Sequence, residues 1–254
     1  MLKEIYNYRE LLKSNIKKEI RGKYKGSFLG ILWSFINPLL MTLVYAIVFP
    51  FILRSGQPHY TTYIVIGILP WNFFTTVISI GTFTILGNAG IIKKVYFPRE
   101  ILPISVVTSG LISFIISIPV IFVFLFFSGI GFSWHLLFLP LVVFAEYILA
   151  LGIVFITCSI NVYIRDLEYI INFFISMLFY ATPIVYSSEL FGDKAWILKL
   201  NPMTTIIEGY RDILFYQRVP NLGHLFLIFI VSFIILFLGI FIFKKLKKGF
   251  AEEI

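Results

Sequence analysis

Charged residues are scarce in this sequence. Only 13% of its 254 residues are Asp, Glu, Lys or Arg, whereas 59% are hydrophobic and 19% are aromatic. A soluble domain carries about 25% charged residues, and a disordered chain carries few apolar ones. The scarcity of charge therefore excludes both classes and predicts a polytopic membrane protein.

Residues that could perform catalysis or hold a metal ion are also scarce. The single cysteine, Cys158, cannot form an intrachain disulfide or a cysteine-rich metal site. The histidines, at positions 59, 135 and 224, share no metal-ligand spacing. The chain has no GxxxxGK[ST] phosphate loop, no GxSxG or HExxH motif and no paired carboxylates. We therefore expect no catalytic residue, no metal site and no ATP site in this chain.

What the sequence does contain is a series of long uncharged runs, at residues 26–53, 55–92, 101–145, 147–164, 169–188 and 219–243. A helix needs about 20 residues to cross ~30 Å of hydrocarbon. The run 101–145 is too long for one crossing, and the turn-forming residues 129–135 divide it. These runs lack the alternation of a barrel, so helices are expected. The sequence predicts an all-α protein with six transmembrane helices, near residues 29–53, 61–86, 103–128, 136–160, 169–186 and 223–243.

Basic residues are divided unevenly between the two sides of these predicted spans. With the N-terminus in the cytoplasm, sixteen of the 21 Lys and Arg residues lie on the cytoplasmic side and five lie outside. The positive-inside rule therefore places both termini, including the tail 244–254, in the cytoplasm. This topology accounts for the net charge of +8, so a nucleic-acid partner is not expected. The charge-rich residues 1–25 predict no secretory signal.

Residues 2–21 have the pattern of an amphipathic helix. An apolar stripe, which includes Ile5 and Ile16, runs beside a basic stripe. The basic stripe consists of Arg9, Lys13, Lys17 and Arg21. Because the two stripes are adjacent, we expect a helix that lies in the headgroup layer with its basic side chains snorkelling. The alternative is an ordinary basic juxtamembrane tail.

Two connections between the predicted spans have unusual composition. The loop 87–102 combines apolar and basic residues, which suggests a docking site, and Pro98 and Pro103 mark breaks on either side of a short helical piece. Alternatively, Val95, Tyr96 and Phe97 anchor the loop in the membrane interface.

The connection 187–222 contains an apolar patch around Trp196 and then a helix, capped by Asn201 and begun by Pro202. One face of this helix is apolar, and Glu208, Arg211 and Asp212 form the other. We expect a re-entrant hairpin whose polar face lines water or a substrate exit, with a helix lying on the surface as the alternative.

One carboxylate and many aromatic residues fall within the predicted spans. An ionised Glu146 near the bilayer centre would cost about 2.5–3.5 kcal/mol, so it is expected to face protein or water. It is either a hydrogen-bonded structural group or a group that lines a pathway. The aromatic residues are either lipid-facing or line a passage where sugar rings stack. The candidates are Trp33, Tyr45, Trp71, Phe73, Phe74, Phe173, Phe174 and Tyr180.

Four separated blocks of this sequence resemble one known family. They are RGKYKGSFLGILWSFINPL at residues 21–39, GILPWNFF at 67–74, IIKKVYFPR at 91–99 and NPMTTIIEGYRD at 201–212. In this order they resemble the ABC-2 type permeases that export polysaccharides and polyol phosphates. The exporters of O-antigen, teichoic acid and capsule belong to this family.

The resemblance implies a homodimer of six-span subunits in the bacterial cytoplasmic (inner) membrane, working with two copies of a separate ATPase that holds ATP and Mg. It implies an undecaprenyl-linked glycan or teichoic acid as cargo. By the same resemblance, residues 1–22 form an interface helix, and the aromatic candidates of the first, second and fifth spans line a channel.

The resemblance also assigns two sets of residues. The helix that couples to the ATPase comprises Ile91, Ile92, Lys93, Lys94, Tyr96, Phe97, Pro98 and Arg99. The outer gate, within 187–222, includes Trp196, Asn201, Pro202, Glu208, Tyr210 and Arg211. An exporter of drugs or small lipids is the nearest alternative. A membrane-embedded transferase would need acid-base residues, and an ion-coupled carrier would show inverted repeats. This sequence shows neither.

Overall fold

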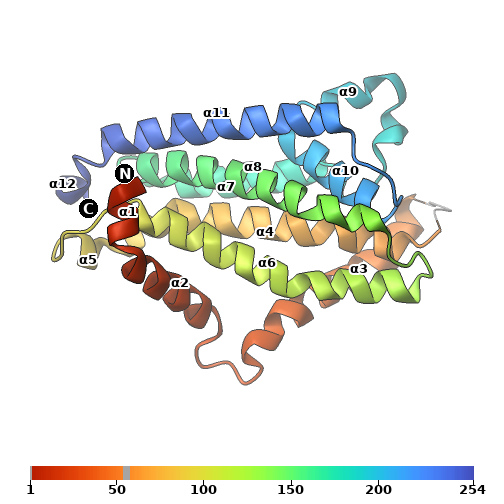
Figure 1. Ribbon diagram of the computed structural model, residues 1–254, viewed down its shortest axis with the longest axis horizontal. Helices are drawn as coiled ribbons and strands as arrows, with labels where there is room; N and C mark the ends of the chain where they lie inside the picture. The colour runs from red at the N-terminus through yellow and green to blue at the C-terminus, as the bar shows by residue number, and fades with distance from the viewer. Residues whose placement is uncertain (1, 54–57) are drawn as a thin grey trace.

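The computed structural model describes residues 2–53 and 58–254, and Figure 1 shows a bundle of helices. No β-strand occurs among the described residues, so the all-α prediction is confirmed. The α-helices are α1 (Leu2–Asn7), α2 (Arg9–Tyr24), α3 (Trp33–Leu53), α4 (Tyr60–Gly87), α5 (Ala89–Ile92), α6 (Ile101–Phe127), α7 (Leu139–Asn161), α8 (Leu167–Tyr180), α9 (Ala195–Leu198), α10 (Pro202–Leu214), α11 (Leu222–Leu246) and α12 (Phe250–Glu253). The 3-10 helices are η1 (Gly30–Leu32), η2 (Trp134–Phe138) and η3 (Ser188–Lys194).

Within the described residues, four helical stretches are long and apolar enough to cross a membrane. They are α4, α6, α11 and the continuous stretch of η2 and α7, Trp134–Asn161. Each has between 25 and 28 residues, which at about 1.5 Å per residue exceeds ~30 Å of hydrocarbon. The prediction of a protein with several membrane helices is confirmed to this extent.

The first and fifth predicted spans fall on α3 and α8. Helix α8 has only 14 residues, about 21 Å of helix. It ends at Tyr180, six residues before the predicted end at 186. The cause is Pro183, which disfavours the helical conformation at Thr182. The count of six spans remains a prediction.

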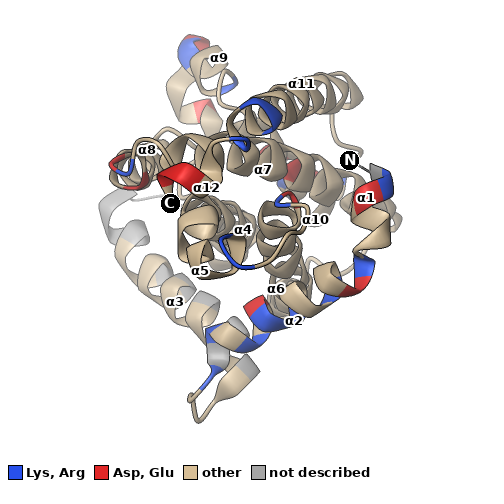
Figure 2. Cartoon of the chain, turned by 90° about the vertical axis from the view of Figure 1, so that its left-hand side faces the viewer, with Lys and Arg blue, Asp and Glu red and all other residues tan. Residues whose placement is uncertain are grey.

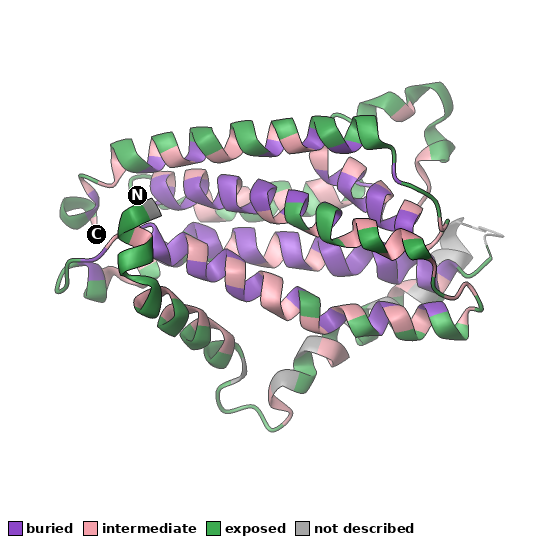
Figure 3. Cartoon of the chain, viewed as in Figure 1, coloured by how far each residue is buried: buried purple, intermediate pink, exposed green. Residues whose placement is uncertain are grey.

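Helix α4 lies at the centre of the bundle, with α3, α6, α7, α8 and α10 packed against it. Its residues Ile64, Val65 and Ile66 are completely buried. Figure 3 shows that burial is concentrated on α4 and α7, whereas α11 is exposed along its outer face. The exposed side chains of α11 are apolar, including Phe226 and Phe237. An apolar outer face of this kind suits contact with lipid.

Helices α7 and α11 approach each other closely through two glycines. A Cβ atom at Gly239 would lie 2.5 Å from the carbonyl oxygen of Gly152, and one at Gly152 would lie 2.7 Å from the backbone nitrogen of Leu236. Only glycine leaves room for such backbone contact, as in other membrane helix pairs with small residues at the interface. This contact holds α11 against the rest of the bundle.

Both termini lie at the same end of the bundle, together with α5 and α12 (Figure 1). Figure 2 looks onto this end and shows Lys and Arg positions on α1, α2 and the end of α11. The helix predicted over residues 2–21 is divided at Tyr8, whose φ of −99° and ψ of 24° interrupt it, and it continues to Tyr24. Helix α2 packs against α6.

Candidate functional site

The loop between α4 and α6 exposes only part of the predicted coupling segment. Tyr96 is 87% exposed, and the side chains of Ile91, Lys93 and Lys94 are exposed beside it. Phe97, by contrast, is 6% exposed and belongs to the hydrophobic core. The remaining members, Ile92, Pro98 and Arg99, are buried or half-buried. The surface that a partner could contact in this conformation is therefore the group Ile91, Lys93, Lys94, Val95 and Tyr96, which we call the loop surface.

The buried side of this loop is fastened to the C-terminal end of α11. The Arg99 guanidinium donates a hydrogen bond to the carbonyl oxygen of Lys247 and lies 5.9 Å from the centre of the Phe250 ring. The Lys247 ammonium pairs with Oε1 of the buried Glu100 at 2.6 Å. Charge-assisted contacts of this kind are stronger than neutral ones, so the loop and the end of α11 form one mechanical unit.

The four basic residues predicted for the interface helix are all exposed on α2. The Lys13 ammonium lies 2.9 Å from Glu10 and holds the pKa of that carboxyl below its ordinary value. Lys18 donates a hydrogen bond of 2.9 Å to the Asn88 side chain, which joins α2 to the loop after α4. Helix α2 therefore contacts the residues just before the loop surface at this end of the bundle.

At the opposite end, α10 begins as the sequence predicts. The Asn201 side chain accepts a hydrogen bond from the Met203 amide at 3.0 Å, and Pro202 occupies the first helical position. Trp196, on α9, is exposed, and Glu208 is half-buried. Arg211, however, is only 3% exposed, so its assignment to a water-facing polar face is wrong. It lies four residues after Ile207 and therefore shares the face of α10 that packs inward.

Arg211 and two tyrosines of α4 bind four consecutive carbonyl groups in the segment after α8. The guanidinium donates to the carbonyl oxygens of Pro183 and, at 2.5 Å, Ile184. The hydroxyl of Tyr60 donates to Val185 at 2.6 Å, and that of Tyr63 donates to Tyr186 at 3.1 Å. We call Arg211, Tyr60 and Tyr63 the carbonyl clamp, because they satisfy backbone groups that no secondary structure covers.

The guanidinium of the clamp has a close fit between α10 and α4. Its central carbon lies 3.5 Å from the centre of the Tyr63 ring, a cation–π contact. A Cβ atom at Gly67 would lie 2.9 Å from Nη2 of Arg211. The absence of a side chain at Gly67 therefore allows the charged group to lie against the backbone of α4.

Glu146 is completely buried and faces protein, as the cost of its charge requires. Its Oε2 accepts a hydrogen bond of 2.7 Å from the hydroxyl of Tyr210, which joins α7 to α10. The Tyr210 ring contacts Phe114, which in turn stacks on Phe73. Of the two interpretations of Glu146, this arrangement favours the hydrogen-bonded structural group.

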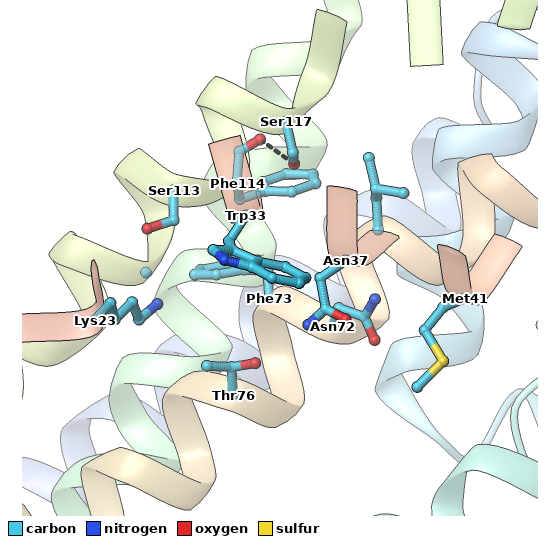
Figure 4. A pocket seen from close by; sticks show the side chains of 12 residues that line it. Lys23, Trp33, Asn37, Met41, Asn72, Phe73, Thr76, Ser113, Phe114 and Ser117 are labelled. Carbon is cyan, nitrogen blue, oxygen red and sulfur yellow. Dashed lines mark hydrogen bonds between the residues drawn. The ribbon is translucent and has the colours of Figure 1, made fainter. Parts of the chain in front are cut away.

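A pocket of about 440 Å³ lies between the end of α2, α3, α4 and α6 (Figure 4). Its lining residues are Lys23, Trp33, Asn37, Met41, Leu69, Asn72, Phe73, Thr76, Gly110, Ser113, Phe114 and Ser117. In Figure 4, the Lys23 ammonium and the Trp33 ring point into this space, and the amides of Asn37 and Asn72 lie together beside that ring. Desolvation lowers the pKa of Lys23, and the charge of Glu19 raises it in part. The pocket combines a cation, amides, hydroxyls and an aromatic face.

The eight aromatic candidates differ in burial: three are buried, one is half-buried and four are exposed. Trp71, Phe73 and Phe74 are buried in α4, where Trp71 and Phe74 pack within the bundle and Phe73 forms part of the pocket wall. Tyr45 is half-buried and stacks against Phe179 at 6.0 Å. The exposed members are Trp33, Phe173, Phe174 and Tyr180. In this conformation Trp71 and Phe74 are buried within the subunit, and the channel role expected of the eight aromatic residues stays a prediction.

The sequence prediction missed the polar part of the pocket. Its lining includes Asn72 and Thr76 on α4 and Ser113 and Ser117 on α6. Each pair is four residues apart, which places both members on one face of a helix. Polar residues at this spacing in two neighbouring apolar spans are the signal that could have identified the pocket.

Comparison with known proteins finds one matching family and several proteins of similar sequence. The family described as ABC-2 type transporter matches residues 10–215. The chain is 34% identical over 257 residues to the O-antigen export system permease protein RfbA of Myxococcus xanthus, across 100% of this chain and 99% of that protein. It is 37% identical over 246 residues to a protein of the same name from Klebsiella pneumoniae, across 96% of this chain and 94% of that protein.

Proposed function

Because the chain belongs to the ABC-2 type transporter family, we propose that it is the permease subunit of an exporter that moves a lipid-linked polysaccharide across the inner membrane. The observation that carries this proposal is the similarity, over almost the whole chain, to permeases named for O-antigen export in two organisms. This similarity favours a polysaccharide over a drug or a small lipid as cargo.

The energy for export comes from ATP hydrolysis on a partner. The sequence has no phosphate loop, and a permease of this family works with an ATPase, which binds the ATP and Mg. We propose that two copies of that ATPase act on a homodimer of six-span subunits. The basic residues on α1, α2 and the end of α11 favour the cytoplasm as the location of the end that carries both termini.

We assign ATPase docking to the loop surface and the exposed basic stripe of α2. Both lie at the end that carries the termini, and both present exposed side chains. The buried Phe97 and Glu100 and the half-buried Arg99 then transmit the push of the closing ATPase pair to α6 and α11, because they hold the loop to the bundle. The movement is a rigid-body rearrangement of packed helices.

At the outer end we assign the gate to the hairpin 187–222. The amphipathic α10 and the exposed Trp196 of α9 support this assignment. The exposed aromatic residues of α3 and α8 form the channel wall, where flat rings can lie against sugar rings.

The experiment that tests the proposed function is deletion of this chain in its own host. Loss of the polymer from the cell surface, with accumulation of the lipid-linked polymer in the cytoplasmic leaflet and unchanged synthesis, is the expected result. As a control, the wild-type chain is expected to restore the surface polymer. It is not expected to do so in a strain whose partner ATPase has its Walker lysine replaced. Normal surface polymer in the deletion strain would refute the proposal.

A further inference from the structure

The pocket between α2, α3, α4 and α6 contains polar groups that the protein itself leaves without partners. No side-chain hydrogen bond joins the Asn37 or Asn72 amide to any described residue, and Lys23 has no ion pair in the described part of the chain. Glu19 lies one turn before Lys23 and lines a smaller adjoining pocket. The structure of the described residues shows no ion pair between Glu19 and Lys23. Lys23 and Asn37 are exposed and Asn72 is half-buried, so all three side chains are accessible to a ligand that enters the pocket.

The chemistry of the lining specifies what that ligand contains. An ammonium group without a counter-ion suits a phosphate. Two amides, each with donors and an acceptor, together with the hydroxyls of Thr76 and Ser113, suit a molecule rich in hydroxyl groups. The exposed Trp33 ring supplies a flat apolar face beside them. A phosphate next to a sugar is the chemical unit that these groups match.

The shape of the pocket suits the head of a lipid rather than a whole polymer. Its volume of about 440 Å³ lies within the usual range of small-ligand sites, roughly 300–1,000 Å³. Met41 and Leu69 line it as well and provide an apolar side. Met41 is exposed, and its neighbours on α3 include the exposed Leu40 and Val44, so apolar surface continues from the pocket along the helix.

We propose that this pocket binds the phosphate-linked sugar at the head of the lipid carrier. Lys23 pairs with the phosphate, Trp33 stacks on the sugar, and Asn37 and Asn72 bind its hydroxyl groups. This inference rests on the proposed function, and it identifies a loading site within one subunit. Phe73 and Phe114 line the pocket, and Phe114 packs against Tyr210 of α10, so the wall of the pocket contacts the helix at the outer end.

The test measures binding to the permease purified with its ATPase in phosphatidylcholine nanodiscs. The probes are undecaprenyl diphosphate-linked N-acetylglucosamine, undecaprenyl diphosphate without the sugar, and phosphatidylglycerol. Wild type is expected to bind the sugar-bearing probe at least tenfold more tightly than phosphatidylglycerol. Equal binding of the two would overturn the proposal and make the pocket a general site for anionic lipid headgroups.

Variants separate the phosphate contact from the sugar contact. Lys23→Gln is expected to weaken binding of both undecaprenyl probes roughly tenfold, the loss of one charge-assisted contact, and Lys23→Arg to retain most of it. Trp33→Leu is expected to weaken only the sugar-bearing probe, by about fivefold. Lys25→Gln is the matched control, because Lys25 is exposed two residues later and does not line the pocket.

The outcomes distinguish this inference from the proposed function. Equal binding by Lys23→Gln and Lys25→Gln, in an exporter that still delivers polymer to the cell surface, refutes the pocket and leaves the exporter function standing. A wild-type complex that neither exports nor binds any lipid-linked glycan refutes both. Co-elution of each variant with the ATPase on gel filtration shows that a loss of binding is not a loss of folding.

Discussion

At the scale of single residues, the carbonyl clamp has the strongest constraints. Arg211 is buried at the junction of α4, α10 and the segment after α8, and its partners there are carbonyl oxygens and the Tyr63 ring. A buried charge is stable only when hydrogen bonds replace its water. Arg211 therefore fixes the position of the chain that leads from α8 to the outer hairpin.

We predict that Arg211→Met lowers the free energy of unfolding by about 2–4 kcal/mol, because each buried acceptor left without a donor costs roughly 1–3 kcal/mol. Thermal unfolding of the detergent-solubilised protein, followed by tryptophan fluorescence, measures this change. Arg218→Met is the matched control, since the Arg218 side chain is 65% exposed and its pair with Asp212 is worth at most about 1 kcal/mol. Equal unfolding temperatures for the two variants would contradict the clamp.

At the scale of helices and loops, the coupling loop has two sides with different roles. Phe97 is packed in the core and Tyr96 projects from the surface. The resemblance implies that both belong to the helix that docks on the ATPase, but a buried ring is not available to a partner. Substitution of the two neighbours therefore separates docking from folding.

Tyr96→Ala is expected to reduce polymer export at least tenfold while the unfolding temperature stays unchanged, because it removes an exposed contact alone. Phe97→Ala is expected to lower the free energy of unfolding by about 3–5 kcal/mol through the cavity it leaves. Surface polymer is measured by immunoblot and stability by thermal unfolding. Full export by Tyr96→Ala would show that the loop surface does not couple ATP hydrolysis to transport.

The pairing of α7 with α11 depends on backbone contact between glycines. Gly239→Val is expected to reduce the unfolding temperature by several degrees and the yield of folded protein, because its side chain would overlap Gly152. Gly22→Ala serves as the control: a Cβ there meets nothing within 4 Å, and the change is expected to stabilise α2 by about 0.4–1 kcal/mol. Unchanged stability of Gly239→Val would mean that the helices can separate without cost.

At the scale of the whole molecule, two faces of the bundle expose large apolar side chains for different reasons. Helix α11 presents residues such as Phe237, and α8 presents Phe174, which are 68% and 52% exposed. We predict that α11 faces lipid and that α8 faces the second subunit of the proposed homodimer. Burial within one chain cannot distinguish these faces, since lipid and a partner helix are equally apolar.

Cross-linking distinguishes the two faces. Phe174→Cys is expected to form a disulfide-linked dimer in native membranes under mild oxidation, whereas Phe237→Cys is expected to remain monomeric on a non-reducing gel. The native Cys158 is completely buried and does not compete. A dimer that forms through position 237 and not through position 174 would place the subunit interface on the opposite side of the bundle.

The sequence by itself determined the membrane class, the all-α fold and four of the membrane helices, because the lengths of uncharged runs are set by the thickness of the bilayer. It also predicted the cap at Asn201, because capping depends on residues that are close in the chain. The resemblance of separated blocks identified the family, which the comparisons show.

Only the tertiary structure decided which side chains of each helix face inward. In the sequence, Arg211 reads as a water-facing charge and Phe97 as an exposed aromatic ring, yet both are buried. Residues far away in the chain supply the carbonyl groups that bind Arg211 and the apolar side chains that surround Phe97. The pocket is assembled from four helices, and Lys23 and Asn72 are separated by more than a whole span. Periodicity gives the face on which a residue lies, but the packing of the helices determines what that face meets.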